Sequence, residues 1–232
     1  MPNPMTPELK HHVQSTFIEA LEFRRAIKAF DETRHLAPED FRFICEAARL
    51  APSSNGIEPW NLIVLREPRL RAEFVQRTGA NPEQAAKASH LVAITAKTAQ
   101  GIDPDTSEYL GHIARTVKGM TPDQVATWRP GFKQFLTRML GVHGSDAAMF
   151  GYTCRQAYIA LAHMLTAAAV IQVDSCALEG LSHAAATDVL ADADLIDPAT
   201  DRFAVAAVFG YRSEDPKRPQ ARRPLGEVVI YS

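Results

Sequence analysis

Residues 51–65 read Ala-Pro-Ser-Ser-Asn-Gly-Ile-Glu-Pro-Trp-Asn-Leu-Ile-Val-Leu, and this stretch carries the strongest structural signal in the chain. Pro52 ends a preceding helical pattern, because a proline ring lacks the N–H donor and clashes with the previous turn. Ser53 and Ser54 leave hydroxyl and amide groups free to donate hydrogen bonds, and Gly56 lets the chain turn at little steric cost. The last four residues are apolar and partly β-branched, as in a buried strand. Taken alone, the stretch predicts an ordinary loop that joins a helix to a strand.

The composition is that of an ordinary globular protein. The 232 residues are 46% hydrophobic and 22% charged, which predicts a single domain over residues 1–232. The net charge of −2 argues against nucleic acid or an anionic membrane surface as a partner. The longest uncharged run, 156–173, contains glutamine, histidine and threonine, so a buried helix is expected rather than a membrane span. Cys45, Cys154 and Cys176 lack CxxC spacing and the chain starts without a signal-peptide pattern, so we expect a cytoplasmic protein with reduced thiols.

Hydrophobic periodicity predicts both helices and strands along the chain. Helices are expected at residues 7–23, 38–50, 68–77, 81–89 and 147–171, the last being the long central helix. A polar helical excursion is expected over 105–139, broken near Gly119 and Pro130. Strands are expected at 61–65, 91–95 and 202–211, and residues 228–231 are expected to add a strand at a sheet edge. Together these elements predict an α+β fold in which helices flank a central mixed sheet.

Three other segments carry cationic or glycine-containing motifs. They are residues 23–31 (FRRAIKAFD), 174–181 (DSCALEGL) and 220–224 (QARRP). With residues 51–65, and in this order, they resemble the FMN-dependent nitroreductase family, most closely its oxygen-insensitive bacterial branch that uses NAD(P)H. Residues 87–98 look like the second strand region of that branch. The resemblance implies the nitroreductase-like fold, FMN as cofactor and NAD(P)H as co-substrate.

The resemblance places cations for the flavin phosphate in the first of these motifs. A phosphate needs cations and N–H donors, and Arg24, Arg25 and Lys28 supply charge just after a helix. In the family the first arginine contacts the phosphate, and the lysine approaches the pyrimidine edge of the ring. Ala26 stands where the family has serine, which removes one hydroxyl donor. The alternative is a solvated cationic helix end.

The tail motif implies a second set of cations. When the segment is aligned on Pro224, Arg222 takes the family's second cation position and Gln220 stands at the first. Arg223, or one of the basic residues at 217–218, is then left to supply the missing charge. The alternative is a basic tail in water.

Further residues are implied to surround the flavin ring, which needs a donor at N5 and positive potential at its pyrimidine edge. In the family the segment matching 174–181, and residues 177–181 in particular, is a loop that covers one face of the ring, and the N–H of Glu179 or Gly180 reaches N5. The residues implied to contact the ring are Ala177, Leu178, Glu179, Gly180, Asn81 and Gln84. Gln84 replaces a lysine of the family, and both helix residues are alternatively exposed to water. Phe135 matches an aromatic that roofs the substrate pocket, with a core aromatic as the equal alternative.

The resemblance also implies an intertwined homodimer with its two sites at the interface, where Pro52, Ser53, Ser54 and Gly56 of one subunit complete the FMN site of the other. The implied reaction is a ping-pong transfer of two electrons from NAD(P)H to nitroaromatics, quinones or similar electron-poor small molecules, with no catalytic side chain. Two alternatives stay open. One is flavin or pteridine reduction, or other flavin chemistry on the same fold. The other is a non-redox ligand-binding or interaction module. The histidines lack metal-site spacing, and neither a Rossmann glycine pattern nor a hydrolase nucleophile elbow is present.

Overall fold

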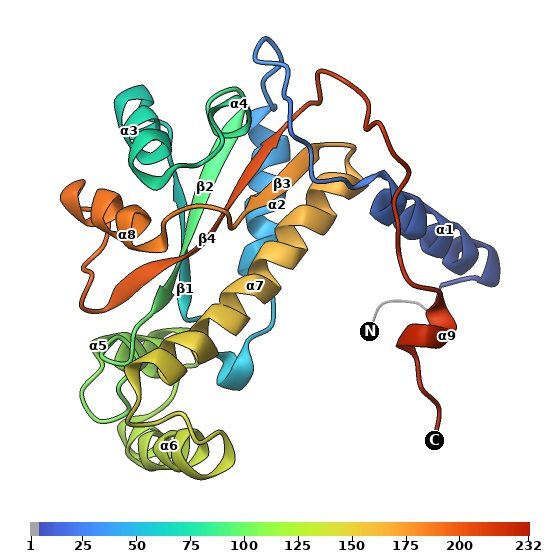
Figure 1. Ribbon diagram of the computed structural model, residues 1–232. Helices are drawn as coiled ribbons and strands as arrows, with labels where there is room; N and C mark the ends of the chain where they lie inside the picture. The colour runs from blue at the N-terminus through green and yellow to red at the C-terminus, as the bar shows by residue number, and fades with distance from the viewer. Residues whose placement is uncertain (1–4) are drawn as a thin grey trace.

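The computed structural model describes residues 5–232, in which helices lie on both faces of one sheet (Figure 1). The helices are α1 (Pro7–Phe23), α2 (Pro38–Arg49), α3 (Pro68–Thr78), α4 (Pro82–Ala85), α5 (Glu108–His112), α6 (Pro122–Gln134), α7 (Asp146–Val170), α8 (His183–Asp192) and α9 (Leu225–Val228). The strands are β1 (Trp60–Val64), β2 (His90–Lys97), β3 (Asp174–Leu178) and β4 (Asp201–Gly210). Shorter helical turns are η1 (Ser54–Gly56), η2 (Ile113–Val117) and η3 (Phe135–Met139).

Local sequence determines where most helices begin. Proline occupies the first turn of α1, α2, α3, α4 and α6, where its missing N–H removes no helical hydrogen bond. Ser145 caps α7, because its hydroxyl accepts a hydrogen bond from Ala148 N at 3.3 Å. Thr121 and Gln124 form a capping box at the start of α6. The predicted helices corresponding to α1, α2, α3 and α7 are confirmed to within one residue at each end.

The sheet has the strand order β1-β2-β4-β3, and each neighbouring pair is antiparallel. A register shift between Ile94 and Thr95 places a bulge in the β2–β4 pairing. An isolated parallel bridge joins Ala26 to Ser175 at the β3 edge, outside the named strands. The sheet within residues 5–232 is therefore antiparallel, and the expectation of a mixed sheet is wrong. The predicted strands corresponding to β1, β2 and β4 are confirmed, and so is the α+β fold.

Two hydrophobic layers pack on opposite faces of this sheet. Val92 and Ile94 of β2 belong to a core shared with α2 and α7, while Leu91 and Ala93 belong to a core shared with α3 and α8. Successive strand residues point to opposite faces, so one apolar strand serves both layers. The long helix α7 runs across one face, as predicted for the central helix (Figure 1).

The excursion between β2 and α7 packs as a third cluster below the sheet. Its buried side chains include Ile102, Leu110, Phe132 and Leu136, which pack with Ile57 from the loop before β1. The break expected near Gly119 is confirmed, since this residue has φ 63° between η2 and α6. The break expected at Pro130 is wrong, because Pro130 lies inside α6. Both Pro130 and Ala126, whose carbonyl loses its helical partner, are exposed, so water can satisfy that carbonyl.

The helix expected at 81–89 is shorter than predicted and ends at Ala85. Arg71 from α3 explains the difference, since its Nε donates to Ala85 O at 2.7 Å and its Nη2 donates to Ala88 O at 2.5 Å. These carbonyls are taken by a guanidinium rather than by the N–H groups of a further helical turn. A contact between distant residues therefore overrides local helix propensity.

Two other segments differ from expectation. Residues 174–178, expected as part of a loop, form strand β3, because they pair with β4 along their whole length. The edge strand expected at 228–231 is wrong, since residues 225–228 form α9 and the following residues are exposed and pair with no strand among residues 5–232. Helix α8, an alanine-rich segment after the β3 loop, was not predicted.

Candidate functional site

A cluster of cations lies where the end of α1 meets the C-terminal tail. Gln220 joins the two, because its Nε2 donates to the carbonyls of Leu21 and Arg24, both at 3.4 Å. Burial lowers the pKa of Arg24, and the nearby charges of Arg222 and Arg25 lower it further. Among the described residues 5–232, Arg24, Arg25 and Arg222 have no carboxylate within ion-pair distance. The fold thus gathers like charges and leaves them available to an anion.

The chain that follows Arg25 runs alongside strand β3. Ile27 N donates to Ser175 O at 3.3 Å, and Lys28 Nζ lies 3.7 Å from Cys176 Sγ. Ala26 and Lys28 are exposed. The buried hydroxyl of Ser175 has no hydrogen-bond partner among residues 5–232, so it stays available to donate or accept a hydrogen bond at this edge.

Gln84 belongs to the same group of residues and is not exposed to water. Its side chain is 3% exposed, and its Nε2 donates to Ile27 O at 2.7 Å. Asn81, at the start of the same short helix, is exposed and caps α4 by accepting a hydrogen bond from Glu83 N at 2.9 Å. Gln84 is therefore fixed against the cationic segment, whereas Asn81 lies exposed at the edge of the same region.

The segment predicted as a flavin-covering loop divides into a strand and a turn. Ala177 and Leu178 end β3, with Ala177 exposed and Leu178 buried, whereas Glu179 and Gly180 are exposed beyond the strand. The hydroxyl of Tyr158 on α7 donates to the Glu179 carboxylate. Burial raises the pKa of Tyr158, and the bond to Glu179 raises it further. Sequence reasoning missed Tyr158 as a partner of this turn, because nothing local pairs residues 21 positions apart.

A cavity of about 250 Å³ lies beside residues 25–29. Its other wall comes from residues 214–217 of the tail, where the carboxylates of Glu214 and Asp215 line it together with Lys217, one of the cations considered for the phosphate. Arg223 is exposed, and its Nη1 lies 3.5 Å from Glu227 O within the tail. Lys217 therefore lies closer to the proposed site than the sequence alone indicated.

A second group of predicted residues lies in the loop before β1. Pro52 is exposed, and Gly56 has φ 55°, a left-handed conformation that favours glycine. Ser53 Oγ accepts a hydrogen bond from Glu58 N at 2.9 Å, and Ser54 N donates to Gln156 Oε1 of α7, also at 2.9 Å.

One buried polar side chain of α7, Gln156, bonds this loop, and a second, Tyr152, packs in the cluster that contains Ile57. Sequence reasoning missed both. Gln156 is 7% exposed and bonds Ser54, while Tyr152 is 2% exposed with an unpartnered hydroxyl. The signal available in the sequence was their polarity inside an alanine-rich helix, since buried polar groups normally have partners. Both side chains lie where α7 meets the loop before β1.

The two groups lie on different sides of α7. Gln156 bonds the loop that carries Ser54, and Tyr158 bonds the turn that carries Glu179. Residues two positions apart on an α-helix are rotated by about 200° about the helix axis, so they point to nearly opposite sides. One chain therefore brings Arg24, Lys28, Gln84, Glu179 and Arg222 toward one region, and leaves Pro52, Ser53, Ser54 and Gly56 on the other side of the helix.

Phe135 lies in the excursion, at the junction of α6 and η3, and packs against the cluster that contains Ile57 of the loop before β1. It is half-buried, and its ring stacks on Phe132 with centroids 6.3 Å apart. Among residues 5–232, no three His, Cys, Asp or Glu side chains gather closely enough to hold a metal ion. Within the same residues, no helix has the length and apolar character needed to cross a membrane.

Comparison with known sequences gives a match over most of the chain. The family model described as Nitroreductase family matches residues 21–211. A relative from Bacillus subtilis (strain 168), named "Putative NAD(P)H nitroreductase YfkO", is 35% identical over 217 residues, which cover 94% of this chain and 97% of the relative.

Solved structures share the fold. The Nitroreductase Family Protein from Streptococcus pneumoniae TIGR4 matches with a TM-score of 0.73 at 23% identity, covering 93% of this chain and 100% of that chain. A structure described as a "putative nitroreductase in complex with FMN", from Exiguobacterium sibiricum 255-15, matches with a TM-score of 0.71 at 20% identity, covering 93% and 97%. At these identities the likeness concerns the fold, and it confirms the fold expected from the four motifs.

Proposed function

The chain belongs to the nitroreductase family, and from that premise we propose that it is an FMN-dependent oxidoreductase that passes two electrons from NAD(P)H to electron-poor small molecules such as nitroaromatics and quinones. One FMN-binding domain spans residues 1–232 in this proposal. The three cysteines are free thiols, which supports the cytoplasmic location proposed for it.

The observation that carries the proposal is the cluster of cations without carboxylate partners. Folding brings Arg24, Arg25 and Arg222 together although their charges repel, and burial adds to the cost of Arg24. A bound phosphate offsets both terms, because charge-assisted hydrogen bonds to guanidinium groups are short and strong. The residues present therefore fit the phosphate of FMN, even though Ala26 and Gln220 lack the serine hydroxyl and the lysine charge of the family motif.

The residues beside this cluster fit the flavin ring. Lys28 supplies a positive charge beside Cys176 of β3, and the exposed turn that follows this strand carries the backbone N–H groups of Glu179 and Gly180, which suit N5. Gln84 holds the Ile27 backbone, and Asn81 lies at the rim of the same region. The bond from Tyr158 to Glu179 keeps that carboxylate turned toward α7.

Completion of the site needs a second copy of the chain in this proposal. Ser53 and Ser54 are on the other side of α7 from Glu179, so a flavin that contacts both groups lies between two subunits. Figure 1 shows α1 and the C-terminal tail standing off from the sheet on the same side. Both segments carry exposed apolar side chains. They are Leu9, Val13 and Phe17 on α1, and Leu225, Val228, Ile230 and Tyr231 on the tail. Soluble monomers rarely expose so many large apolar side chains on two segments, which supports an intertwined homodimer.

The chemistry follows from this arrangement. FMN, when bound, would supply two-electron transfer between NAD(P)H and an acceptor that occupies the same place in turn, in ping-pong order. Arg24 and Arg222 would hold its phosphate, and Lys28 would keep positive potential at the ring edge. Phe135 contributes an aromatic surface to the substrate pocket of the assembled dimer. No side chain of this chain is assigned proton transfer.

A test of the proposal measures FMN affinity and turnover together. Purified protein should be yellow and should oxidise NAD(P)H with a quinone or a nitroarene, giving the parallel double-reciprocal lines of a ping-pong reaction. Arg222→Ala should weaken FMN binding by about ten- to a hundredfold, since a charge-assisted hydrogen bond contributes about 1.5–3 kcal/mol. Arg69→Ala, which removes an exposed arginine far from the cluster, should leave the affinity unchanged.

Other outcomes separate the alternatives. Colourless protein that binds no FMN would leave the non-redox ligand-binding module, and a panel in which flavins or pteridines are reduced faster than quinones would favour the reductase alternative. An unchanged FMN affinity in Arg222→Ala would transfer the phosphate role to Lys217. Sedimentation tests assembly: Phe17→Lys should weaken the dimer, and Ser15→Lys on the opposite face of α1 should not. A flavin-loaded monomer would contradict the shared site.

A further inference from the structure

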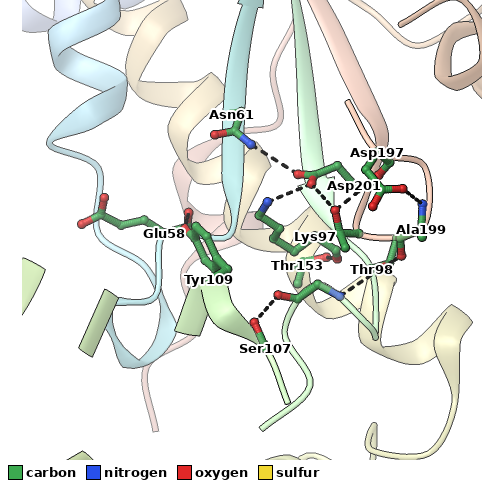
Figure 2. Close-up of polar contacts among 12 residues, drawn as sticks. Glu58, Asn61, Lys97, Thr98, Ser107, Tyr109, Thr153, Asp197, Ala199 and Asp201 are labelled. Atoms are coloured by element: carbon green, nitrogen blue, oxygen red, sulfur yellow. Dashed lines mark hydrogen bonds and ion pairs between the residues drawn. The ribbon is translucent and has the colours of Figure 1, made fainter. Parts of the chain in front are cut away.

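A buried polar junction lies at the end of the sheet nearest the excursion (Figure 2). Lys97 at the end of β2 and Asp201 at the start of β4 form an ion pair at 2.8 Å, with side chains 11% and 8% exposed. Asp201 also accepts hydrogen bonds from Asn61 Nδ2 at 3.3 Å and from Thr200 Oγ1 at 2.9 Å. These hydrogen bonds satisfy both carboxylate oxygens of Asp201, and a buried ion pair is stable only when its remaining polar atoms have such partners.

Tyr109 of α5 packs against this junction. The ammonium of Lys97 lies 4.6 Å from the centroid of the Tyr109 ring, a cation–π contact that orients the ring. The hydroxyl at the other end shares its single proton between Ile57 O, at 2.8 Å, and Glu58 O. Burial raises the pKa of Tyr109, and the charges of Glu58 and Asp201 raise it further, so the hydroxyl stays a donor throughout the physiological range. A cleft of about 470 Å³ opens beside Lys97, but the charge of this lysine is already paired with Asp201.

A second side chain of the excursion bonds the loop before β1, which also contains Ile57 and Glu58. Lys118, which follows η2, donates from Nζ to Asn55 O and lies 5.0 Å from the centroid of the Trp128 ring. The excursion therefore holds the loop at two places, through Lys118 near its tip and Tyr109 near its base.

The loop needs this support because its backbone is strained. Asn55, Gly56 and Glu58 have φ values of 56°, 55° and 45°, in the left-handed region that residues other than glycine rarely adopt. Such conformations persist only where surrounding contacts favour them. The two residues proposed to donate to FMN, Ser53 and Ser54, come directly before this strained turn.

We infer that Tyr109 is a positioning residue for the cofactor site: its hydroxyl, set by the Lys97–Asp201 pair, holds the carbonyls of Ile57 and Glu58 and so keeps Ser53 and Ser54 in the conformation that meets FMN. The inference rests on the proposed function for its last step only. It makes the excursion, which also carries Phe135, a support for the loop as well as a wall of the pocket.

Tyr109→Phe tests the inference, because it keeps the ring under Lys97 and removes only the hydroxyl. In the protein without added flavin, amide hydrogen exchange over residues 53–58 should rise about fivefold or more, since opening of the loop loses its main restraint. The dissociation constant for FMN should rise about tenfold, because a ligand binds less tightly when its competent conformation is less populated. Visible circular dichroism of the flavin at saturation should change, which reports site geometry rather than stability.

Two variants provide the controls. Thr187→Val removes a buried hydroxyl that donates to His183 O and accepts from Phe203 N, outside the cofactor site, so it should lower stability while loop exchange and FMN affinity stay unchanged. Tyr109→Leu removes ring and hydroxyl and should exceed Tyr109→Phe in both effects.

The outcomes are distinguishable. Unchanged loop exchange in Tyr109→Phe overturns the inference, whether or not FMN binds. Faster exchange with unchanged FMN affinity overturns the role toward the cofactor. Wild-type protein that binds no FMN overturns the proposed function, and the exchange experiment then decides by itself whether Tyr109 holds the loop.

Discussion

Replacing Arg212 by methionine should lower the free energy of unfolding by about 3–5 kcal/mol, because it removes the cation of a buried ion pair. Asp174, which begins β3, is 4% exposed at its side chain, and Arg212 is 19% exposed. Arg212 Nη2 lies 2.5 Å from Asp174 Oδ1, and Nε lies 3.0 Å from the same oxygen. The guanidinium also stacks 4.6 Å from the ring centroid of Phe23, so the pair joins β3 to the end of α1. After the substitution, the carboxylate keeps only the backbone N–H of residue 212 as a partner within this contact.

An exposed ion pair of similar length provides the matched control. Arg77 Nη1 lies 2.7 Å from Asp192 Oδ2, with side chains 36% and 63% exposed. Because water solvates both partners after the change, Arg77→Met should lower stability by less than about 1 kcal/mol. The double variant Arg212→Met with Asp174→Asn should recover at least half of the loss, since it leaves no buried charge.

Urea denaturation followed by circular dichroism measures these differences, provided that the m-value stays constant so that the midpoint reports stability. A loss below about 1 kcal/mol in Arg212→Met would refute the reasoning, because the pair would then behave as a solvated surface pair. A double variant no more stable than the single one would show that the lost packing on Phe23, rather than the stranded charge, accounts for the effect.

Three further predictions concern single positions. Burial and, to a lesser extent, the charges of Arg66 and Arg71 lower the pKa of His90 to about 4. Because the unfolded chain then binds a proton at higher pH than the folded chain, stability should fall as the pH drops from about 6.5 toward 4, by about 1 kcal/mol at pH 5 after allowing for the partial exposure of the ring. Urea titrations of His90→Phe at several pH values should lack this pH dependence. Gln84→Lys should raise the midpoint potential of bound flavin by about 20 mV, and a midpoint that stays or falls in a redox titration would remove residue 84 from the ring edge. Gly101→Ala should destabilise the fold by about 1–3 kcal/mol in thermal unfolding, because a Cβ there would lie 2.2 Å from a backbone carbonyl oxygen.

Much of the fold could be predicted because its signals are local. Prolines in the first turn and side-chain caps fixed the starts of most helices, and the apolar runs that became β2 and β4 were long enough to be recognised as buried strands. Errors arose where a distant residue intervened. The carbonyls beyond Ala85 bond to Arg71, and the segment after Asp174 becomes a strand only because β4 lies beside it.

The candidate site shows the same division. Four motifs in order pointed to the family and to cations for a phosphate, and the fold does bring Arg24 and Arg222 together. Sequence did not reveal that Gln84 is buried against Ile27, or that Gln156 and Tyr158 hold the two halves of the site on different sides of one helix. Those facts depend on helix rotation and packing.

The sequence by itself determined most helix starts, the apolar runs of β1, β2 and β4, the family and the chemical character of the site, since each depends on residue types and short spacings. Only the tertiary structure decided the strand order β1-β2-β4-β3 and the partners of the buried charges. Arg212 and Asp174 are 38 positions apart, Tyr109 and Ile57 are 52 apart, and Lys97 and Asp201 are 104 apart. No local pattern encodes such pairs, because a contact across that distance exists only once the whole sheet and its covering helices have fixed where both residues lie.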